Sequence, residues 1–126
     1  MEKQVIYTPD APLIGSHLSQ AVRAGNLVFT SGVTPRDPKT HQIVEGDIGQ
    51  QTERTILNLK AILEAAGSSL DKVVKVNIYL TDSRNKPAMN KVYVKYFPKD
   101  PPARTTVEVS KAGTIVPIEI EMVAMI

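Results

Sequence analysis

Cysteine and tryptophan are absent from this 126-residue chain, and aromatic residues make up only 5% of it. Without cysteine there is no disulfide framework, no thiolate nucleophile and no cysteine-based metal site, and this absence suits a reducing compartment such as the cytoplasm. The scarcity of aromatic rings argues against a surface on which the bases of a nucleic acid would stack.

Long apolar runs and runs of one charge are also missing. No stretch approaches the roughly 18 consecutive apolar residues of a membrane span. The N-terminus, with Glu2 and Lys3, has the features of neither a signal peptide nor a transit peptide. The net charge is +2 with the two signs interspersed, so no basic stripe is present to follow a phosphate backbone. We therefore expect a cytoplasmic protein that binds neither membrane nor nucleic acid.

Motifs for cofactors and metals are missing too. The seven glycines are scattered and form neither a dinucleotide-binding fingerprint nor a P-loop. His17 and His41 are the only histidines, too few for a histidine-rich metal site. Ser16 and His17 are neighbours, and neighbouring side chains of an extended segment point apart, which argues against a catalytic pair. We expect neither a metal nor a cofactor.

The spacing of apolar residues predicts one α+β domain over residues 1–126. A capping box of Asp47 and Gln50 precedes a helix expected over 48–66, which Gly67 ends. A second helix is expected near 86–97, with Pro87 in its first turn. Short β-rich or alternating runs predict five strands, at 5–8, 27–31, 73–80, 103–110 and 115–126. The order β-β-α-β-α-β-β predicts a mixed sheet with both helices on one face.

The two-residue period of a strand assigns side chains to the two faces of the sheet. On the helix-covered face we place Val74 of segment 73–80 and four residues of segment 103–110, namely Ala103, Thr105, Val107 and Val109. Arg104 then falls on the opposite face together with Val73, Tyr79, Glu119 and Glu121. That face is half polar and half apolar, and such a face often contacts another subunit. A homo-oligomer with sites at its interfaces is therefore expected.

Arg104 is the strongest candidate for a functional residue. The rigid run Pro101-Pro102-Ala103 ends at the start of a strand and preorganises the guanidinium that follows. The planar fork of an arginine matches a carboxylate with two parallel hydrogen bonds, so we interpret Arg104 as the anion-binding anchor of a small-molecule site. An ion pair with Glu119 or Glu121 on a neighbouring strand is the structural alternative, and the pattern leaves it open.

Short segments, in their order and spacing, make the chain resemble the RidA (YjgF-type) family of imine deaminases over essentially its whole length. The segments that carry the resemblance are Ala11-Pro12, Ile14-Gly15, Ser19-Gln20-Ala21-Val22, Gly25-Asn26, Thr30-Ser31-Gly32, Asp37-Pro38-Lys39-Thr40, Asn58 to Gly67, Val73-Val74-Lys75-Val76, Asn90-Lys91-Val92-Tyr93, Pro102-Ala103-Arg104-Thr105 and Glu119-Ile120-Glu121. The resemblance implies a chorismate-mutase-like fold and a homotrimer with a cleft at each subunit interface. The implied activity, part of metabolite damage control, converts 2-imino acids such as 2-iminobutanoate and 2-iminopropanoate to 2-keto acids and ammonia, without metal or organic cofactor.

The resemblance also implies roles for individual residues. Arg104 falls on the arginine that grips the substrate carboxylate, and Glu119 falls on the acid that positions the attacking water. Ser31 and Gly32 match a turn that lines the cleft, and Asn90 matches an asparagine that contributes a polar contact.

Two positions depart from the family pattern. Gly15-Ser16-His17 stands where the family usually has Gly-Pro-Tyr, so His17 replaces a tyrosine beside the substrate. A histidine in the cleft would be a usable acid or hydrogen-bond donor near neutral pH. Ala112-Gly113 replaces the usual Leu-Pro, a change that concerns loop shape.

Two other functions stay open at this point. One is a non-catalytic small-molecule binder or chaperone-like trimer that keeps the cleft. The other is a translation inhibitor with ribonuclease activity, as has been described for proteins resembling this family. The interspersed charges give RNA binding little support, whereas the presence of Arg104 favours the deaminase.

Overall fold

The computed structural model describes residues 2–13, 15–111 and 116–126. Its helices and strands follow one another as β1 (Lys3–Ile6), β2 (Ala21–Ala24), β3 (Leu27–Thr30), α1 (Ile48–Ala65), β4 (Val73–Leu80), α2 (Lys86–Tyr96), β5 (Ala103–Glu108) and β6 (Ile118–Met125). Short 3-10 turns at Leu70–Lys72 and Ser83–Asn85 precede β4 and α2. The two predicted helices and the five predicted strands are present, and β2 is an additional strand.

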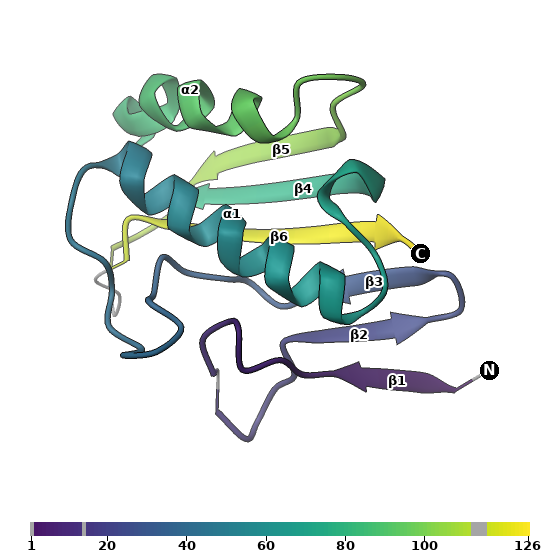
Figure 1. Cartoon of the computed structure of the whole chain (residues 1–126). Helices are drawn as coiled ribbons and strands as arrows, with labels where there is room; N and C mark the ends of the chain where they lie inside the picture. The colour runs from purple at the N-terminus through teal and green to yellow at the C-terminus, as the bar shows by residue number, and fades with distance from the viewer. Residues whose placement is uncertain (1, 14, 112–115) are drawn as a thin grey trace.

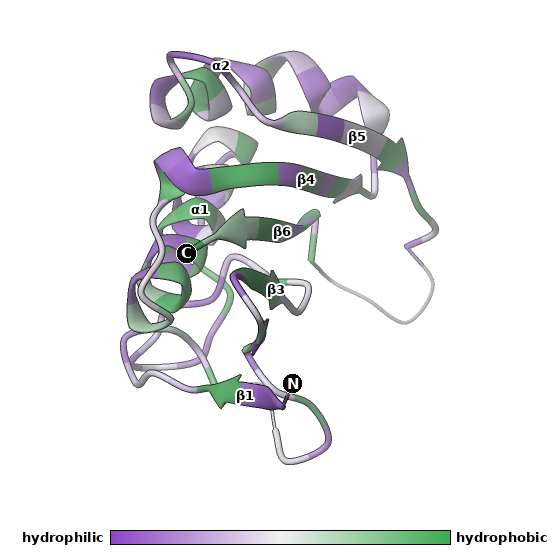
Figure 2. Cartoon of the chain, turned by 90° about the vertical axis from the view of Figure 1, so that its right-hand side faces the viewer, coloured by the Kyte–Doolittle hydropathy of each residue, from purple (hydrophilic) through white to green (hydrophobic). Residues whose placement is uncertain are grey.

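The six strands form one mixed sheet in the order β1-β2-β3-β6-β4-β5. Only the β4–β5 pair is parallel among the described strands. Both helices lie on one face of the sheet, with α1 across its middle and α2 along the β5 edge (Figure 1). This confirms the predicted α+β class and agrees with a chorismate-mutase-like fold. In the described part of the chain no helix covers the other face of the sheet, which we call the open face (Figure 2).

Helix α1 forms where its local signals predict it. The Asp47 carboxylate accepts a hydrogen bond from the Gln50 backbone N–H at 2.9 Å, and the Gln50 side chain accepts one from the Asp47 N–H at 3.0 Å. The helix ends at Ala65, and Gly67 follows with a φ of 83°, the left-handed conformation expected of it. Its buried side chains pack against those of β4 and β6 in the core of the protein: Ile56, Leu59, Ile62, Leu63, Val76, Ile78, Leu80, Ile118, Ile120 and Met122.

Strand β2 is absent from the predicted order because its sequence, Ala21–Ala24, has little β propensity of its own. The strand forms by pairing. Its register joins Ala24 to Leu27 across the two-residue turn Gly25-Asn26, and Gly25 has a φ of 62°. A Gly-Asn pair between two short runs is a hairpin signal. The Gly25-Asn26 pair could therefore have identified the strand from the sequence.

The prediction that Val74 lies on the helix-covered face and Val73 on the opposite face is wrong. Val73 is buried, whereas Val74 is exposed. The register of β4 against β6 shifts between Val73 and Lys75, which indicates a β-bulge, and a bulge reverses the alternation of the residues before it. The last strand also begins later than predicted, at Ile118, and residue 115 lies outside the described residues.

No helix in the described residues is long and apolar enough to cross a membrane.

Candidate functional site

Arg104 lies on the helix-covered face of the sheet, at its β5 edge. The parallel register of β4 and β5 pairs Arg104 with Val76, which is fully buried under the helices, and paired residues of neighbouring strands share a face. The guanidinium carbon lies 4.6 Å from the centre of the Tyr93 ring on α2. Glu119 pairs with Tyr79 on the open face. The prediction that Arg104 and Glu119 share a face is therefore wrong.

The same register corrects the faces of the other residues of this strand. Thr105 and Val107 pair with Asn77 and Tyr79 on the open face, and Val107 is 43% exposed. The alternation of apolar and polar residues in β5 predicts the wrong buried face. The strand lies at the edge of the sheet, and its more apolar side is not the buried one. Its face is set by pairing with β4, a contact between distant parts of the sequence.

Arg104 has no carboxylate partner among the described residues. The ion pairs found there join Lys60 to Glu64 and Arg84 to Asp82. The alternative left open by the sequence, an ion pair with Glu119 or Glu121, is excluded because the sheet separates these carboxylates from the guanidinium. Arg104 is only partly exposed, so its charge is held near an aromatic ring without a counter-ion from the described chain.

Tyr93 contacts Arg104, and Asn90 lies near Tyr93 on α2. Asn90 and Tyr93 lie three residues apart on α2, and therefore on one side of the helix. The Asn90 Oδ1 and Tyr93 hydroxyl atoms are buried without a hydrogen-bond partner in the described part of the chain, as is Thr106 Oγ1 two residues beyond Arg104. Burial raises the pKa of Tyr93, and the nearby Arg104 charge opposes that rise, although their geometry falls short of a hydrogen bond. We call Arg104, Asn90 and Tyr93 the arginine half-site.

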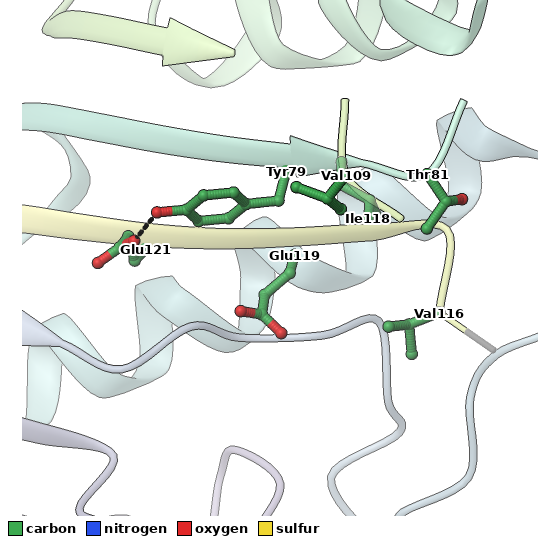
Figure 3. A pocket seen from close by; sticks show the side chains of 7 residues that line it. All are labelled: Tyr79, Thr81, Val109, Val116, Ile118, Glu119 and Glu121. Atoms are coloured by element: carbon green, nitrogen blue, oxygen red, sulfur yellow. Dashed lines mark hydrogen bonds between the residues drawn. The ribbon is translucent and has the colours of Figure 1, made fainter. Parts of the chain in front are cut away.

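Glu119 lies on the open face, beside a cleft of about 310 Å³. Tyr79, Thr81, Val109, Val116, Ile118 and Glu121 complete the lining (Figure 3). The Glu119 carboxylate packs directly against Gly32, so closely that a side chain at position 32 would overlap it. Backbone hydrogen bonds of 2.8 and 3.0 Å between Val33 and Ile120 hold the two segments together. Partial burial raises the pKa of Glu119, and the negative charge of Glu121 raises it further.

Tyr79 contacts one of the two carboxylates of this cleft. Its hydroxyl donates a hydrogen bond to Glu121, and that bond raises the pKa of Tyr79. In Figure 3 the Tyr79 ring points along the sheet toward Glu121, while Glu119 turns away toward the loop that contains Gly32. We call Glu119, Glu121, Tyr79 and Gly32 the carboxylate half-site. Sequence reasoning placed Tyr79 and Glu121 on this face, but it gave neither a role.

Ser31 ties the carboxylate half-site to the segment that follows His17. Its hydroxyl donates to the Ser19 carbonyl at 2.5 Å, and its backbone N–H donates to the Gln20 carbonyl at 2.9 Å. His17 itself is exposed, lies against Gly15 and is not among the residues that line the Glu119 cleft. The structure thus brings Gly32 to Glu119, and Asn90 and Tyr93 lie on one side of α2, whereas His17 does not line the Glu119 cleft. Ile14, Ala112 and Gly113 lie outside the described residues.

Across the described residues, no three histidine, aspartate or glutamate side chains are placed to hold a metal ion. The site therefore consists of a guanidinium, two carboxylates, a tyrosine hydroxyl on each face and an amide. Such groups can bind an anion, orient a water molecule and move protons.

Comparison with known proteins shows the same fold in named relatives. The family model described as Endoribonuclease L-PSP matches residues 8–126. A RutC family protein of Pyrococcus horikoshii is 51% identical over 122 residues, which are 97% of each chain. A 2-iminobutanoate/2-iminopropanoate deaminase of Dermatophagoides farinae is 37% identical over 98% of this chain and 97% of its own. The crystal structure of RidA from an Antarctic Psychrobacter species superposes with a TM-score of 0.92 at 41% identity, covering 98% of this chain and 99% of that one.

Proposed function

Since the chain belongs to the Endoribonuclease L-PSP family, we propose that it hydrolyses small 2-imino acids, such as 2-iminobutanoate and 2-iminopropanoate, to 2-keto acids and ammonia. The observation that carries the proposal is the partly buried Arg104 guanidinium, which no carboxylate of the described residues neutralises. A guanidinium in this state is suited to bind the carboxylate of a small ligand through two parallel hydrogen bonds. The name of the Dermatophagoides relative supports the substrate class.

The proposed active site is shared by two copies of the chain. Within one copy, a small substrate bound by Arg104 cannot reach Glu119, because the sheet lies between them. We therefore propose that Arg104 on the β5 edge of one copy meets the open face of its neighbour. That face carries the exposed apolar side chains Phe29, Val107 and Met125, which burial against another copy would remove from water. Three such contacts would close a homotrimer with a cleft at each interface.

In the proposed reaction, Arg104 holds the substrate carboxylate while Glu119 orients a water molecule. The water oxygen bonds to C2 as Glu119 accepts one of its protons, and the electron pair of the C=N bond moves to nitrogen, which takes up a proton from solvent. This step forms a carbinolamine. Glu119 then returns its proton to the nitrogen, which restores the carboxylate, the C–N bond breaks, and ammonia leaves with the bonding electrons. Loss of the hydroxyl proton to solvent completes the 2-keto acid.

The surroundings of Glu119 suit it to this role. A raised pKa makes an ionised carboxylate a stronger base, and proton transfer by a positioned base contributes about 10²–10⁴-fold to a rate. Imines hydrolyse without a catalyst, so positioning and one base supply a useful acceleration. We place the reaction in the cytoplasm, because a chain without cysteine suits a reducing compartment.

The family description also names an endoribonuclease activity. Glu119 and Glu121 both lie at the cleft, and two carboxylates repel the phosphates of RNA. The proposed deaminase is therefore favoured over RNA cleavage. A non-catalytic trimer that binds the same ligands would bind a 2-keto acid without accelerating its formation.

The test generates 2-iminobutanoate with a threonine dehydratase and follows the release of 2-ketobutanoate with and without this protein. We expect acceleration by the unmodified protein and strong losses in Arg104→Ala and Glu119→Ala. Arg84→Ala and Glu64→Ala are matched controls on exposed side chains, and both are expected to keep full activity. If the unmodified protein does not accelerate the release of 2-ketobutanoate, the proposed deaminase activity is refuted. If Arg104→Ala keeps full activity, the proposed role of Arg104 in binding the substrate carboxylate is refuted.

A further inference from the structure

Tyr93 lies directly under the proposed substrate anchor. Its ring centre is 4.6 Å from the Arg104 guanidinium carbon, within the distance at which a cation is attracted to the face of an aromatic ring. Tyr93 is 5% exposed, so the contact is shielded from water. In the described part of the chain, the partly buried cation thus has an aromatic face beside it and no carboxylate.

Phe97, the residue that directly follows α2, packs against the Tyr93 ring. The two ring centres are 4.7 Å apart with an angle of 33° between their planes, and Phe97 is 7% exposed. The residues are four positions apart, so they meet on one side of the helix. The Tyr93 ring is therefore held between the Arg104 guanidinium and the protein core.

A guanidinium beside one aromatic ring keeps hydrogen-bond donors for a ligand. An arginine has five N–H donors that spread out in the plane of the group, so a single ring cannot occupy all of them. Because no described carboxylate competes for Arg104, the ring contact restrains the group while its donors stay available for a ligand. The buried Tyr93 hydroxyl has no hydrogen-bond partner in the described part of the chain, so the ring accounts for the contact with Arg104.

We propose that Tyr93 is a positioning residue for Arg104: its ring, supported by Phe97, holds the guanidinium plane in the orientation that presents two N–H donors to a substrate carboxylate. This inference rests on the proposed function, because it takes the Arg104 ligand to be a 2-imino acid or its 2-keto acid product. Tyr93 acts through Arg104, so its effect falls on ligand affinity rather than on proton transfer at Glu119.

The test compares Tyr93→Leu, which removes the ring, with Tyr93→Phe, which keeps it. We expect Tyr93→Leu to raise both KM and the Kd of 2-ketobutanoate by about five- to thirtyfold, the range for a shielded cation–π contact, with little effect on kcat. Tyr93→Phe is expected to recover most of the lost affinity. Tyr96→Leu is the matched control, because it removes a tyrosine of the same helix whose hydroxyl donates to Glu53 instead.

A second series keeps the shape of the ring and changes its electrostatics. Fluorinated phenylalanine analogues at position 93 weaken the attraction for a cation step by step without removing packing volume, so they remain informative where Tyr93→Leu fails to fold. We expect the Kd of 2-ketobutanoate to rise with each added fluorine. A Kd that is independent of fluorination, or a Tyr93→Phe protein as impaired as Tyr93→Leu, overturns the inference. An unmodified protein that neither binds 2-ketobutanoate nor hydrolyses the imine refutes the proposed function itself, which distinguishes the two failures.

Discussion

Arg104 and Glu119 project from opposite faces of the same sheet, and strand β4 lies between the strands that carry them. Each is partly buried, and each is surrounded by its own group of polar side chains. One copy of the chain therefore holds two separate half-sites. An active site that uses both residues must combine the arginine half-site of one copy with the carboxylate half-site of another.

Mixing two inactive variants tests this arrangement. Arg104→Ala keeps the carboxylate half-site, and Glu119→Gln keeps the arginine half-site, so random co-assembly regenerates complete sites at some interfaces. With equal amounts and one contributor of each half-site per interface, about a quarter of the sites are expected to be intact. Deaminase activity of the co-expressed, purified mixture measures this fraction.

The matched control mixes Arg104→Ala with the double variant Arg104→Ala/Glu119→Gln. No interface of that mixture has an arginine half-site, so no activity is expected to return. Recovery in the control, or no recovery in the complementary mixture although the variants co-assemble, would show that the two residues do not act across an interface.

The sequence predicts those parts of the fold whose signals are local. The Asp47–Gln50 capping box, the helical spacing from Ile56 to Leu63 and the alternation of β6 are each contained in one segment, and each prediction is confirmed. Pro87 likewise lies in the first turn of α2 as expected. Such signals need no knowledge of what the segment packs against.

The errors arise where a contact between distant segments decides the outcome. Pairing of β5 with β4 sets the face on which Arg104 lies. A bulge exchanges the faces of Val73 and Val74. Pairing with β3 across the Gly25-Asn26 turn makes β2 a strand. Arg104 became a candidate from the rigid run that precedes it and Glu119 from the resemblance, and the structure partly buries both side chains. Tyr93 was missed as a site residue because a tyrosine in an apolar stripe is indistinguishable from a core residue until its neighbours are known. Tyr79 was placed on the correct face but given no role, because its hydrogen bond to Glu121 depends on the pairing of β4 with β6.

Gly32→Ala tests the close contact between Gly32 and Glu119. The added methyl group would overlap the end of the Glu119 side chain, which can rotate away, so the fold is expected to survive while the base is displaced. We expect kcat to fall by about 10²-fold or more, in the range for loss of a positioned base, with a small change in Tm. Gly49→Ala in the first turn of α1 is the control, because its methyl group has only ordinary or slightly tight contacts and does not approach Glu119. Unchanged activity in Gly32→Ala would mean that the position of Glu119 is unimportant.

Asp47→Ala tests the contribution of the helix cap to stability. The substitution removes the side-chain acceptor of the Gln50 N–H at the start of α1. We expect the free energy of unfolding in urea to fall by about 1 kcal/mol, with deaminase activity retained in the folded protein. Glu64→Ala, which removes only an exposed ion pair with Lys60, is expected to change that free energy by less than about 0.5 kcal/mol. Equal effects of the two substitutions would contradict the assigned role of the cap.

Glu121→Gln is expected to shift the pH dependence of the reaction. Glu119 acts as a base only when ionised, so activity is lost as the pH falls through its pKa, which burial and the Glu121 charge both raise. The substitution removes that charge but keeps an oxygen that can accept the Tyr79 hydrogen bond. The acidic limb of the kcat/KM profile should therefore move to lower pH, toward the ordinary value for a glutamate. Glu53→Gln removes a carboxylate outside the cleft and should leave the acidic limb of the kcat/KM profile unchanged. A shift to higher pH, or none, would mean that the Glu121 charge does not act on the proton-accepting group.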